Sequence, residues 1–182
     1  MPAPTLESER LILHPLSLLH LSQQYVNWLN DEEVSRYISY SKGHTTTLDE
    51  LKNYLEEVEK KDILFWGIHT RTSGKHIGNI KIDPVIKKYG LCEYGILIGD
   101  KEEWGKGYAK EASQLVIDYC FNILNLRKMT LGVTACNEGA VKLYKNLGFE
   151  IEGIFKKQEF HFGKYQDGLR MAFFNSAYKY LD

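Results

Sequence analysis

The sequence has no long hydrophobic run, and no apolar stretch approaches the roughly 20 residues that a membrane-spanning helix needs. Its first ten residues are polar and lack the apolar segment of a secretory signal. The formal net charge of −1 provides no overall basic field for nucleic acid. These absences argue against a membrane protein and a nucleic-acid-binding protein. We therefore expect a cytoplasmic protein with neither a membrane nor a nucleic acid as its partner.

Cysteine is also scarce. The three cysteines, Cys92, Cys120 and Cys136, are an odd number, lie far apart and form no CxxC pair. A disulfide framework and a zinc site both need closer or paired spacing. We expect buried free thiols, no metal, and the reducing cytoplasm as the compartment.

What is present is typical of one globular domain. The chain has 182 residues, of which 43% are hydrophobic and 26% charged, which is enough for a substantial core. Hydrophobic periodicity and turn residues predict the order β-α-α-β-β-β-α-β-α-β-β, an α/β single domain over residues 1–182. We expect strands at residues 11–13, 63–70, 76–82, 91–98, 129–135, 149–162 and 165–174, and helices at 17–29, 47–58, 108–124 and 137–148, with a short helical piece at 31–37.

The same periodicity predicts which helix residues face the core. We expect Thr47 to cap the second long helix, with Glu50 completing a capping box. We expect the strand at 76–82 to be closed by Asp83 and Pro84. The residues predicted to face inward are Leu18, Leu21, Tyr25, Trp28 and Leu29 in the first helix, Leu48, Leu51, Tyr54, Leu55 and Val58 in the second, and Ala109, Ala112, Val116, Tyr119, Cys120 and Ile123 in the third.

The most informative segment is residues 92–112, an apolar strand followed by a turn with Gly105 and Gly107 at the start of a helix. Glycines there let backbone N–H groups point at one spot, where the helix dipole favours an anion such as a pyrophosphate. The pattern lacks the third glycine of a dinucleotide-binding turn, and no Walker A loop occurs. Lys106 and Lys110 lie where a cation opposes the dipole, which favours a bound anion. A helix start without a ligand is the alternative.

A second motif lies at residues 137–149. Asn137, Ala140, Tyr144, Gly148 and Phe149 match, at every position, the N-x-x-A-x-x-x-Y-x-x-x-G-F pattern of the GCN5-related N-acetyltransferase (GNAT) superfamily, which the chain resembles. Residues 102–107 resemble the Q/R-x-x-G-x-G/A signature of that family, with Glu102 in place of the usual Gln or Arg. The likeness is greatest to the branch with ribosomal-protein, spermidine and nucleotide-sugar amine acetyltransferases.

The resemblance implies a GNAT-like fold, with a mixed, mostly antiparallel central sheet splayed between two middle strands and helices on both faces. It implies transfer of acetyl from acetyl-CoA, the cosubstrate, to a primary amine by direct attack in a ternary complex, without a metal. The backbone N–H of Leu97 would bind the thioester oxygen as it becomes anionic. The residues implied to hold the cofactor are Ile96, Leu97, Ile98, Trp104, Gly105, Lys106, Gly107, Tyr108, Ala109, Asn137 and Tyr144.

The same resemblance suggests the catalytic groups. Tyr144, with an ordinary pKa of about 10, would give a proton to the departing thiolate, unless it is only a packed helix tyrosine. Asn137 would cap its helix under either interpretation. Glu93 is a candidate base, because a half-buried carboxylate on this strand would have a raised pKa. A salt-bridged strand residue is the equal alternative for Glu93.

The acceptor is a small-molecule amine whose identity the sequence leaves open. Aromatic and cationic residues would suit a nucleotide-linked amino sugar, or are instead packing residues and solvated charges. A polyamine would need carboxylates such as those of residues 31–33. A ribosomal-protein N-terminus and a non-catalytic CoA-binding module are further alternatives, and we expect a monomer or homodimer. The candidate acceptor-binding residues are Trp28, Arg36, Tyr37, Glu93 and His161, with Tyr40 and His44 as further possibilities.

Overall fold

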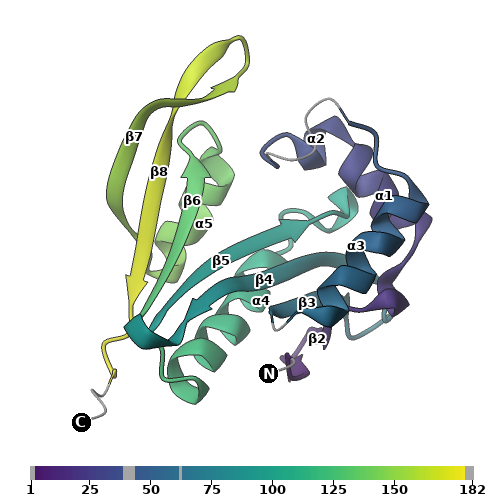
Figure 1. Ribbon diagram of the computed structural model, residues 1–182, viewed down its shortest axis with the longest axis horizontal. Coiled ribbons are helices and arrows are strands. Elements are labelled where there is room, and N and C mark those ends of the chain that lie inside the picture. Colours follow the sequence, from purple (N-terminus) through teal and green to yellow (C-terminus); the bar gives the residue numbers. More distant parts are fainter. Residues whose placement is uncertain (1–2, 39–43, 62, 179–182) are drawn as a thin grey trace. The chain divides into compact units, whose positions relative to one another are not determined.

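The structure is a computed structural model that describes residues 3–38, 44–61 and 63–178 (Figure 1). Its eight strands are ordered β1-β2-β3-β4-β5-β6-β8-β7 in one mostly antiparallel sheet with one parallel pair, β5 and β6. The strands are β1 (Leu6–Glu7), β2 (Leu11–Pro15), β3 (Leu64–Thr70), β4 (His76–Ile86), β5 (Leu91–Ile98), β6 (Lys128–Thr134), β7 (Glu150–His161) and β8 (Lys164–Phe174). The helices are α1 (Gln23–Asn30), α2 (Glu32–Ser35), α3 (Leu48–Lys60), α4 (Tyr108–Asp118) and α5 (Glu138–Leu147). The predicted α/β class and element order are confirmed, with the two-residue β1 in addition.

The chain divides into two compact units, which are described separately. The first, unit 1, comprises Met1–Asp83 and Gly95–Leu115. The second, unit 2, comprises Pro84–Tyr94 and Val116–Asp182. None of the helices described in either unit is both long and apolar enough to cross a membrane.

Unit 1 builds its core between the first helices and the antiparallel strands β2, β3 and β4. The register pairs Leu11 with Thr70 and Leu64 with Ile82. Figure 1 shows α1 and α3 close together beside β3 and β4. Their buried faces form one apolar cluster with β3, composed of Leu16, Tyr25, Val26, Trp28, Leu29, Val34, Leu51, Leu55, Val58 and Phe65. The predicted capping box of α3 is confirmed, since Thr47 Oγ1 accepts from the N–H of Glu50 and the carboxylate of Glu50 accepts from the N–H of Thr47.

Three residues predicted to face the core of unit 1 are exposed. The predicted helix at 17–29 is broken, because residues 18–20 form a 3₁₀ turn and α1 begins only at Gln23. Leu18 is therefore off the helical face and exposed. Leu48 and Tyr54 of α3 are also exposed, because only Leu51, Leu55 and Val58 lie on the stripe that contacts the cluster. A surface helix buries a stripe, and residues at its margin remain in solvent.

The strand predicted to close at Asp83 and Pro84 continues through both residues to Ile86. Pairing of β4 with β3 extends to Ile82, opposite Leu64. Pro84 therefore lies beyond that stretch of β3 and needs no N–H to bond with it, which is where a strand tolerates proline.

Unit 2 contains β6, β8 and β7, the start of β5, and α5. Its core side chains include Met129, Leu131, Leu147, Phe149 and Met171. The predicted long hairpin is confirmed: β7 and β8 are joined by Phe162 and Gly163, whose φ angles of 53° and 73° are those of a two-residue type I′ turn. Figure 1 shows this hairpin extending beyond the end of β6.

The predicted helix at 108–124 is α-helical only to Asp118. After Asp118 the chain adopts a π-helical turn at residues 119–123, in which the N–H of Leu124 bonds to the carbonyl of Tyr119. A π turn inserts one residue per turn and rotates the following side chains. Ile123, predicted to face inward, is therefore 72% exposed.

Candidate active site

The glycine turn of unit 1 has the geometry that an anion-binding backbone needs. Gly105 and Gly107 have φ angles of 75° and 84°, in the region that favours glycine. A Cβ at Gly105 would meet nothing within 4 Å, so the turn is open there. The first helical bond of α4 runs from the N–H of Glu111 to the carbonyl of Gly107. The N–H groups of the preceding turn therefore have no helical acceptor, and Gly107 has no side chain to cap them. These backbone groups fit a pyrophosphate.

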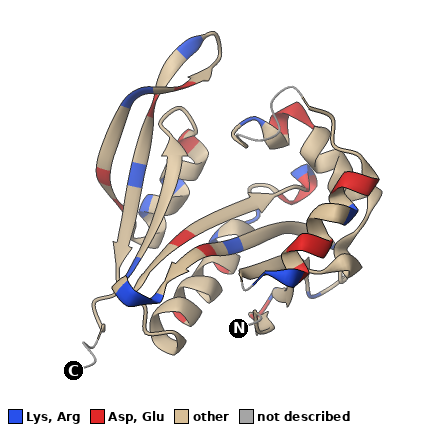
Figure 2. Cartoon of the chain, viewed as in Figure 1, with Lys and Arg blue, Asp and Glu red and all other residues tan. Residues whose placement is uncertain are grey.

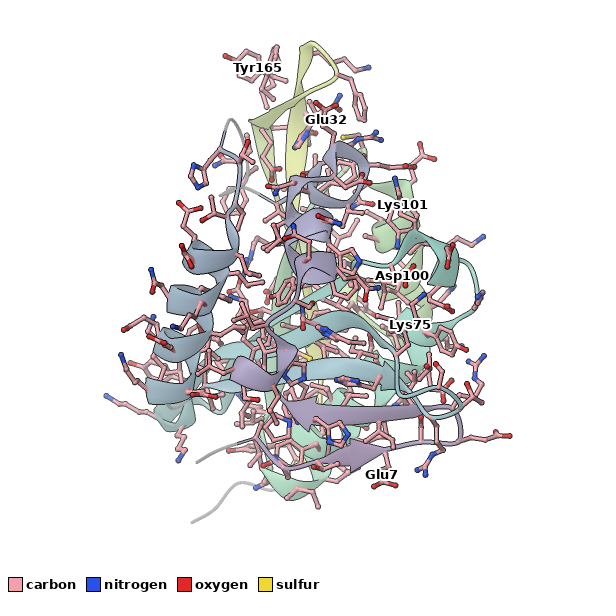
Figure 3. The ribbon with its side chains drawn as sticks, turned by 90° about the vertical axis from the view of Figure 1, so that its right-hand side faces the viewer. Glu7, Glu32, Lys75, Asp100, Lys101 and Tyr165 are labelled. Carbon is pink, nitrogen blue, oxygen red and sulfur yellow. The ribbon has the colours of Figure 1, made fainter. Side chains whose placement is uncertain are left out.

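Charged side chains around the turn are paired with one another. Lys106 Nζ lies 2.8 Å from Glu103, and this bond raises the pKa of Lys106. The anion beside Lys106 is thus a protein carboxylate. Glu102, at the position where the family has Gln or Arg, contacts Lys75 at 3.5 Å and is largely exposed. Lys75 also binds the buried Asp100 at 2.6 Å, and Figure 3 shows these two residues together at the end of β5.

Arg10 forms hydrogen bonds that stabilise the glycine turn, a role that the sequence analysis did not predict. Its Nη1 donates to the carbonyl of Lys106 at 3.0 Å, and its Nε donates to Glu111 at 2.7 Å. The guanidinium carbon lies 4.8 Å from the centre of the Tyr108 ring, a cation–π distance. One side chain from before β2 thus links both sides of the glycine turn. No local pattern signals this contact, because Arg10 and Lys106 are 96 residues apart.

The end of β5 carries the backbone groups predicted to pair with the pantetheine arm. The indole N–H of Trp104 donates to the carbonyl of Ile98 at 2.8 Å, so this carbonyl already has a partner. The side chain of Leu97 packs against the apolar cluster of unit 1. A Cβ at Gly78 would lie 2.2 Å from the carbonyl oxygen of Leu97, so glycine is needed for β4 to approach β5 this closely. The roles of Ile96 and of the Leu97 N–H stay predictions.

In unit 2, α5 positions Tyr144. Asn137 Oδ1 accepts from the N–H of Ala140, which confirms the predicted N-cap, and Gly148 ends the helix with a φ of 102°. Tyr144 is 8% exposed, and its ring lies 5.8 Å from that of Tyr94 and 6.0 Å from that of Phe149. Burial raises the pKa of Tyr144 to about 12. Its hydroxyl therefore keeps its proton at neutral pH and is a hydrogen-bond donor.

Glu93 forms an ion pair with Arg170, a residue that the sequence analysis missed. Arg170 Nη1 and Nη2 lie 2.9 and 3.0 Å from the two carboxylate oxygens of Glu93. The bond to Glu93 raises the pKa of Arg170. Of the two interpretations of Glu93, the structure shows the salt-bridged one. The role of Glu93 as a base stays a prediction.

The predicted acceptor residues lie in different environments. Trp28 is buried in the cluster of unit 1 and packs on Gly99, where a Cβ would lie 2.1 Å from the indole. It is therefore a core residue, and an acceptor cannot reach its ring. Arg36 is exposed and Tyr37 half-buried, both just after α2. Of the further candidates, His44 pairs with Glu50 at 3.1 Å, whereas Tyr40 lies outside the described residues.

His161, which was expected to line the acceptor site, is buried in the hairpin of unit 2. Its Nε2 lies 3.2 Å from Glu159, whose carboxylate also accepts a bond from Thr134. The ring is thus held by its own strand.

The cysteines are free thiols in the structure. Cys92 and Cys120 are buried as predicted, while Cys136 is half-buried. A hydrogen bond with Cys92 and burial together raise the pKa of Cys120, so it stays an unreactive thiol. Among the residues described, no three His, Cys, Asp or Glu side chains are arranged to hold a metal ion.

Comparison with known proteins identifies the family of this chain. Residues 10–150 match the acetyltransferase (GNAT) domain family. The chain is 34% identical over 105 residues to spermidine N(1)-acetyltransferase of Escherichia coli, which covers 58% of this chain and 56% of that protein. It is 36% identical over 102 residues to the Vibrio cholerae spermidine N(1)-acetyltransferase, covering 56% of this chain and 58% of that one. The matched part thus spans little more than half the length of these relatives.

Solved structures extend the likeness to almost the whole chain. Spermidine N-acetyltransferase from Vibrio cholerae in complex with CoA and spermine superposes with a TM-score of 0.81 at 28% identity, covering 94% of this chain and 99% of that one. Ribosomal-protein-S5-alanine acetyltransferase from Vibrio fischeri shares the fold, with a TM-score of 0.74 at 20% identity over 97% of this chain and 99% of that one. Because the family model matches residues 10–150, this chain belongs to the acetyltransferase (GNAT) domain family.

Proposed function

We propose that this protein transfers the acetyl group of acetyl-CoA to a primary amine of a small aliphatic polyamine, by direct attack in a ternary complex. The observation that carries the proposal is Tyr144, a buried hydroxyl on α5 that is protonated at neutral pH and can donate a hydrogen bond. A packed tyrosine without function would be equally buried, so the family motif around it is the second support.

In unit 1, the cofactor's pyrophosphate would be held by the N–H groups of residues 105–109, because the N–H of Trp104, also predicted for this role, already donates to the carbonyl of Lys101 at 3.2 Å. The two positive-φ glycines and the uncapped first turn of α4 support this assignment. Arg10 supports it indirectly by fixing the carbonyl of Lys106. The cofactor supplies an activated acetyl thioester, and the Leu97 N–H would stabilise the oxygen of that thioester as charge develops.

In unit 2, Tyr144 would donate a hydrogen bond to the sulfur as the C–S bond breaks, and would then give it a proton. An ordinary thiol has a pKa of about 8.5, so complete transfer from a buried tyrosine is uphill. The hydrogen bond therefore contributes first, while negative charge is still building on the sulfur. The attacking nitrogen must have lost its own extra proton, because an ammonium has no lone pair.

Charge around the first helices supports a cationic acceptor. In α3, five acidic side chains outnumber two lysines, and Figure 2 shows acidic segments along α2 and α3. Next to α2, Lys101 already binds Asp31 and Glu33, at 2.6 and 3.3 Å, and offsets one charge of this acidic run. Figure 3 shows Glu32, the third carboxylate of this run, above Lys101. The relatives named for spermidine support the same class.

A nucleotide-linked amino sugar has weaker support than the polyamine. That hypothesis relied on aromatic side chains free to stack on a base, and the largest of them, Trp28, is buried in the core of unit 1. The N-terminus of a ribosomal protein has the support of fold likeness alone.

The test is release of CoA thiol from acetyl-CoA with separate acceptors. Spermidine, spermine, free amino acids, a UDP-linked amino sugar and an N-terminal ribosomal-protein peptide would each be supplied. We expect turnover with spermidine or spermine and loss of turnover in Tyr144→Phe. Tight CoA binding without turnover on any amine would identify a non-catalytic CoA-binding module and refute the proposal. Turnover with the peptide alone or the UDP-sugar alone would support acetyl transfer, but would refute a polyamine as the acceptor.

A further inference from the structure

Arg170 and Glu93 meet although a whole strand separates them in the sheet of unit 2. Glu93 lies on β5 opposite Thr130 of β6. Arg170 lies on β8, opposite Gly132 of the same strand β6. The guanidinium must therefore cross β6 to place its two nitrogens 2.9 and 3.0 Å from the carboxylate oxygens.

Gly132 provides the gap that this crossing needs. A Cβ at Gly132 would lie 3.3 Å from Arg170 Nη1, tighter than an ordinary contact. On the other side of β8, Gly153 of β7 lies opposite Arg170, and a Cβ there would touch only the Arg170 Cβ. Arg170 thus has a glycine on each neighbouring strand, and Gly132, on the side of Glu93, lies next to its guanidinium.

The backbone just before Glu93 is also fixed to β6. Thr130 Oγ1 donates to the carbonyl of Cys92, the residue before Glu93, at 3.2 Å. A bidentate arginine–carboxylate pair is more directional than a single bond, and each carboxylate oxygen can still accept a further hydrogen bond. The side chains of Glu93 and Arg170 are 41% and 32% exposed, so a ligand can reach the pair.

We propose that Arg170 is a positioning residue: reaching over Gly132, it holds Glu93 as an oriented carboxylate that accepts a hydrogen bond from the acceptor amine. Glu93 then anchors the amine and takes no proton from it. The proton of the ammonium leaves to solvent before attack, and the nitrogen lone pair becomes the nucleophile. This inference rests on the proposed function and adds a role for Arg170 and Gly132.

The physical reason is that Arg170 and a proton would compete for the carboxylate oxygens of Glu93. A general base must take up a proton on a carboxylate lone pair, and the guanidinium already occupies one lone pair on each oxygen. The same bond benefits an anchor, because it fixes the direction of the remaining lone pairs. Orientation of a reacting nitrogen lowers the entropic part of the barrier.

The experiment compares steady-state kinetics and pH profiles of the full-length protein, with spermidine as acceptor. The variants are Glu93→Gln, Arg170→Gln, Arg170→Lys, and the double variant of Glu93→Gln with Arg170→Gln. We expect Glu93→Gln and Arg170→Gln each to raise the KM for spermidine about tenfold, while the KM for acetyl-CoA stays within about twofold. We expect the double variant to be no worse than either single one, because both remove the same interaction.

Two further variants separate positioning from simple stability. Gly132→Ala keeps both charged groups but crowds Arg170 Nη1, so it should raise the KM for spermidine by a smaller factor. Lys128→Gln removes another cross-strand ion pair of the same unit, that with Glu152, and should leave both KM values unchanged. Arg170→Lys keeps the positive charge but cannot bond to both carboxylate oxygens as the guanidinium does. Its affinity for spermidine should therefore lie between those of wild type and Arg170→Gln.

The outcomes are distinct. The inference is overturned if the ascending limb of the pH profile shifts or disappears in Glu93→Gln, because Glu93 would then be the base. It is also overturned if Arg170→Gln lowers only the melting temperature, or if the two single effects add in the double variant. Wild-type protein that turns over no amine would refute the proposed function and this inference together. Normal wild-type turnover with unaltered variants would refute this inference alone.

Discussion

Nε2 of His20 lies 3.1 Å from Nε2 of His69, so one hydrogen is shared between two histidine rings. The other hydrogen bonds of the two rings show which Nε2 carries this hydrogen. His69 Nδ1 donates to the carbonyl of Gly74, which leaves its Nε2 as an acceptor. His20 Nδ1 accepts from the N–H of Ser17, so His20 Nε2 carries the hydrogen. His76 stacks on His69 with ring centres 5.0 Å apart and donates from Nε2 to Asn79. This arrangement requires neutral rings.

The histidine cluster predicts loss of stability in acid. Burial lowers the pKa of both His20 and His76 to about 4, against 6.5 in the unfolded chain. The unfolded state therefore binds more protons, and the contribution of each ring is fully present above pH 6.5 and lost as the pH falls towards 4. Chemical denaturation at pH 7.5 and 5.0 should show lower stability at pH 5.0, by about 1–2 kcal/mol for the cluster as a whole.

Two variants check the source of this pH dependence. His76→Gln should lower stability at pH 7.5 and reduce the difference between the two pH values. His44→Gln, which changes an exposed histidine outside the cluster, should leave the difference unchanged. An equal pH dependence in wild type and His76→Gln would contradict the prediction.

Tyr144→Phe should lower kcat by about 10² or more, because it removes the donor that serves the departing sulfur. The KM for acetyl-CoA should change little, and the melting temperature should stay close to that of wild type, since the ring contacts with Tyr94 and Phe149 remain. The readout is thiol release under saturating acetyl-CoA. A kcat equal to that of wild type would remove Tyr144 from the acid role.

Gly107→Ala should weaken acetyl-CoA binding. An alanine at a φ of 84° costs about 1–2 kcal/mol and tilts the N–H groups that begin α4. Gly74→Ala is the matched control, since Gly74 has a φ of 66° and a Cβ there would meet nothing within 4 Å. Both variants should lose similar stability, but only Gly107→Ala should raise the KM for acetyl-CoA. Equal KM values in the two variants would argue against a pyrophosphate at this turn.

Arg10→Gln should also raise the KM for acetyl-CoA, with kcat nearly unchanged. It removes the bonds to Lys106 and Glu111 that hold the turn in place. Arg71→Gln provides the comparison, because Arg71 likewise binds one carboxylate, that of Glu7, and one carbonyl, that of Ser8, away from the turn. If Arg71→Gln raised the KM as much as Arg10→Gln, the effect would be general loosening of unit 1.

The order of the elements was predictable because its signals are local. Thr47 with Glu50, Asn137 with Gly148, and the hairpin around Gly163 each act within a few residues, and all three were confirmed. The errors arose where local periodicity was extended too far. Ile123 is exposed because a π turn shifts the helix, and Pro84 remains in β4 because the stretch of β3 paired with that strand ends at Leu64.

The sequence by itself determined the family, the glycine turn and the tyrosine on α5, because spacing within a short segment defines each of them. Only the tertiary structure decided which side chains serve these motifs. Glu93 and Arg170 are 77 residues apart, and Arg10 and Lys106 are 96 apart. Trp28 was recognisable as a large aromatic, yet its burial on Gly99 depends on how α1 packs on the turn after β5. Contacts of this kind follow from packing between distant segments, and a sequence pattern carries no record of them.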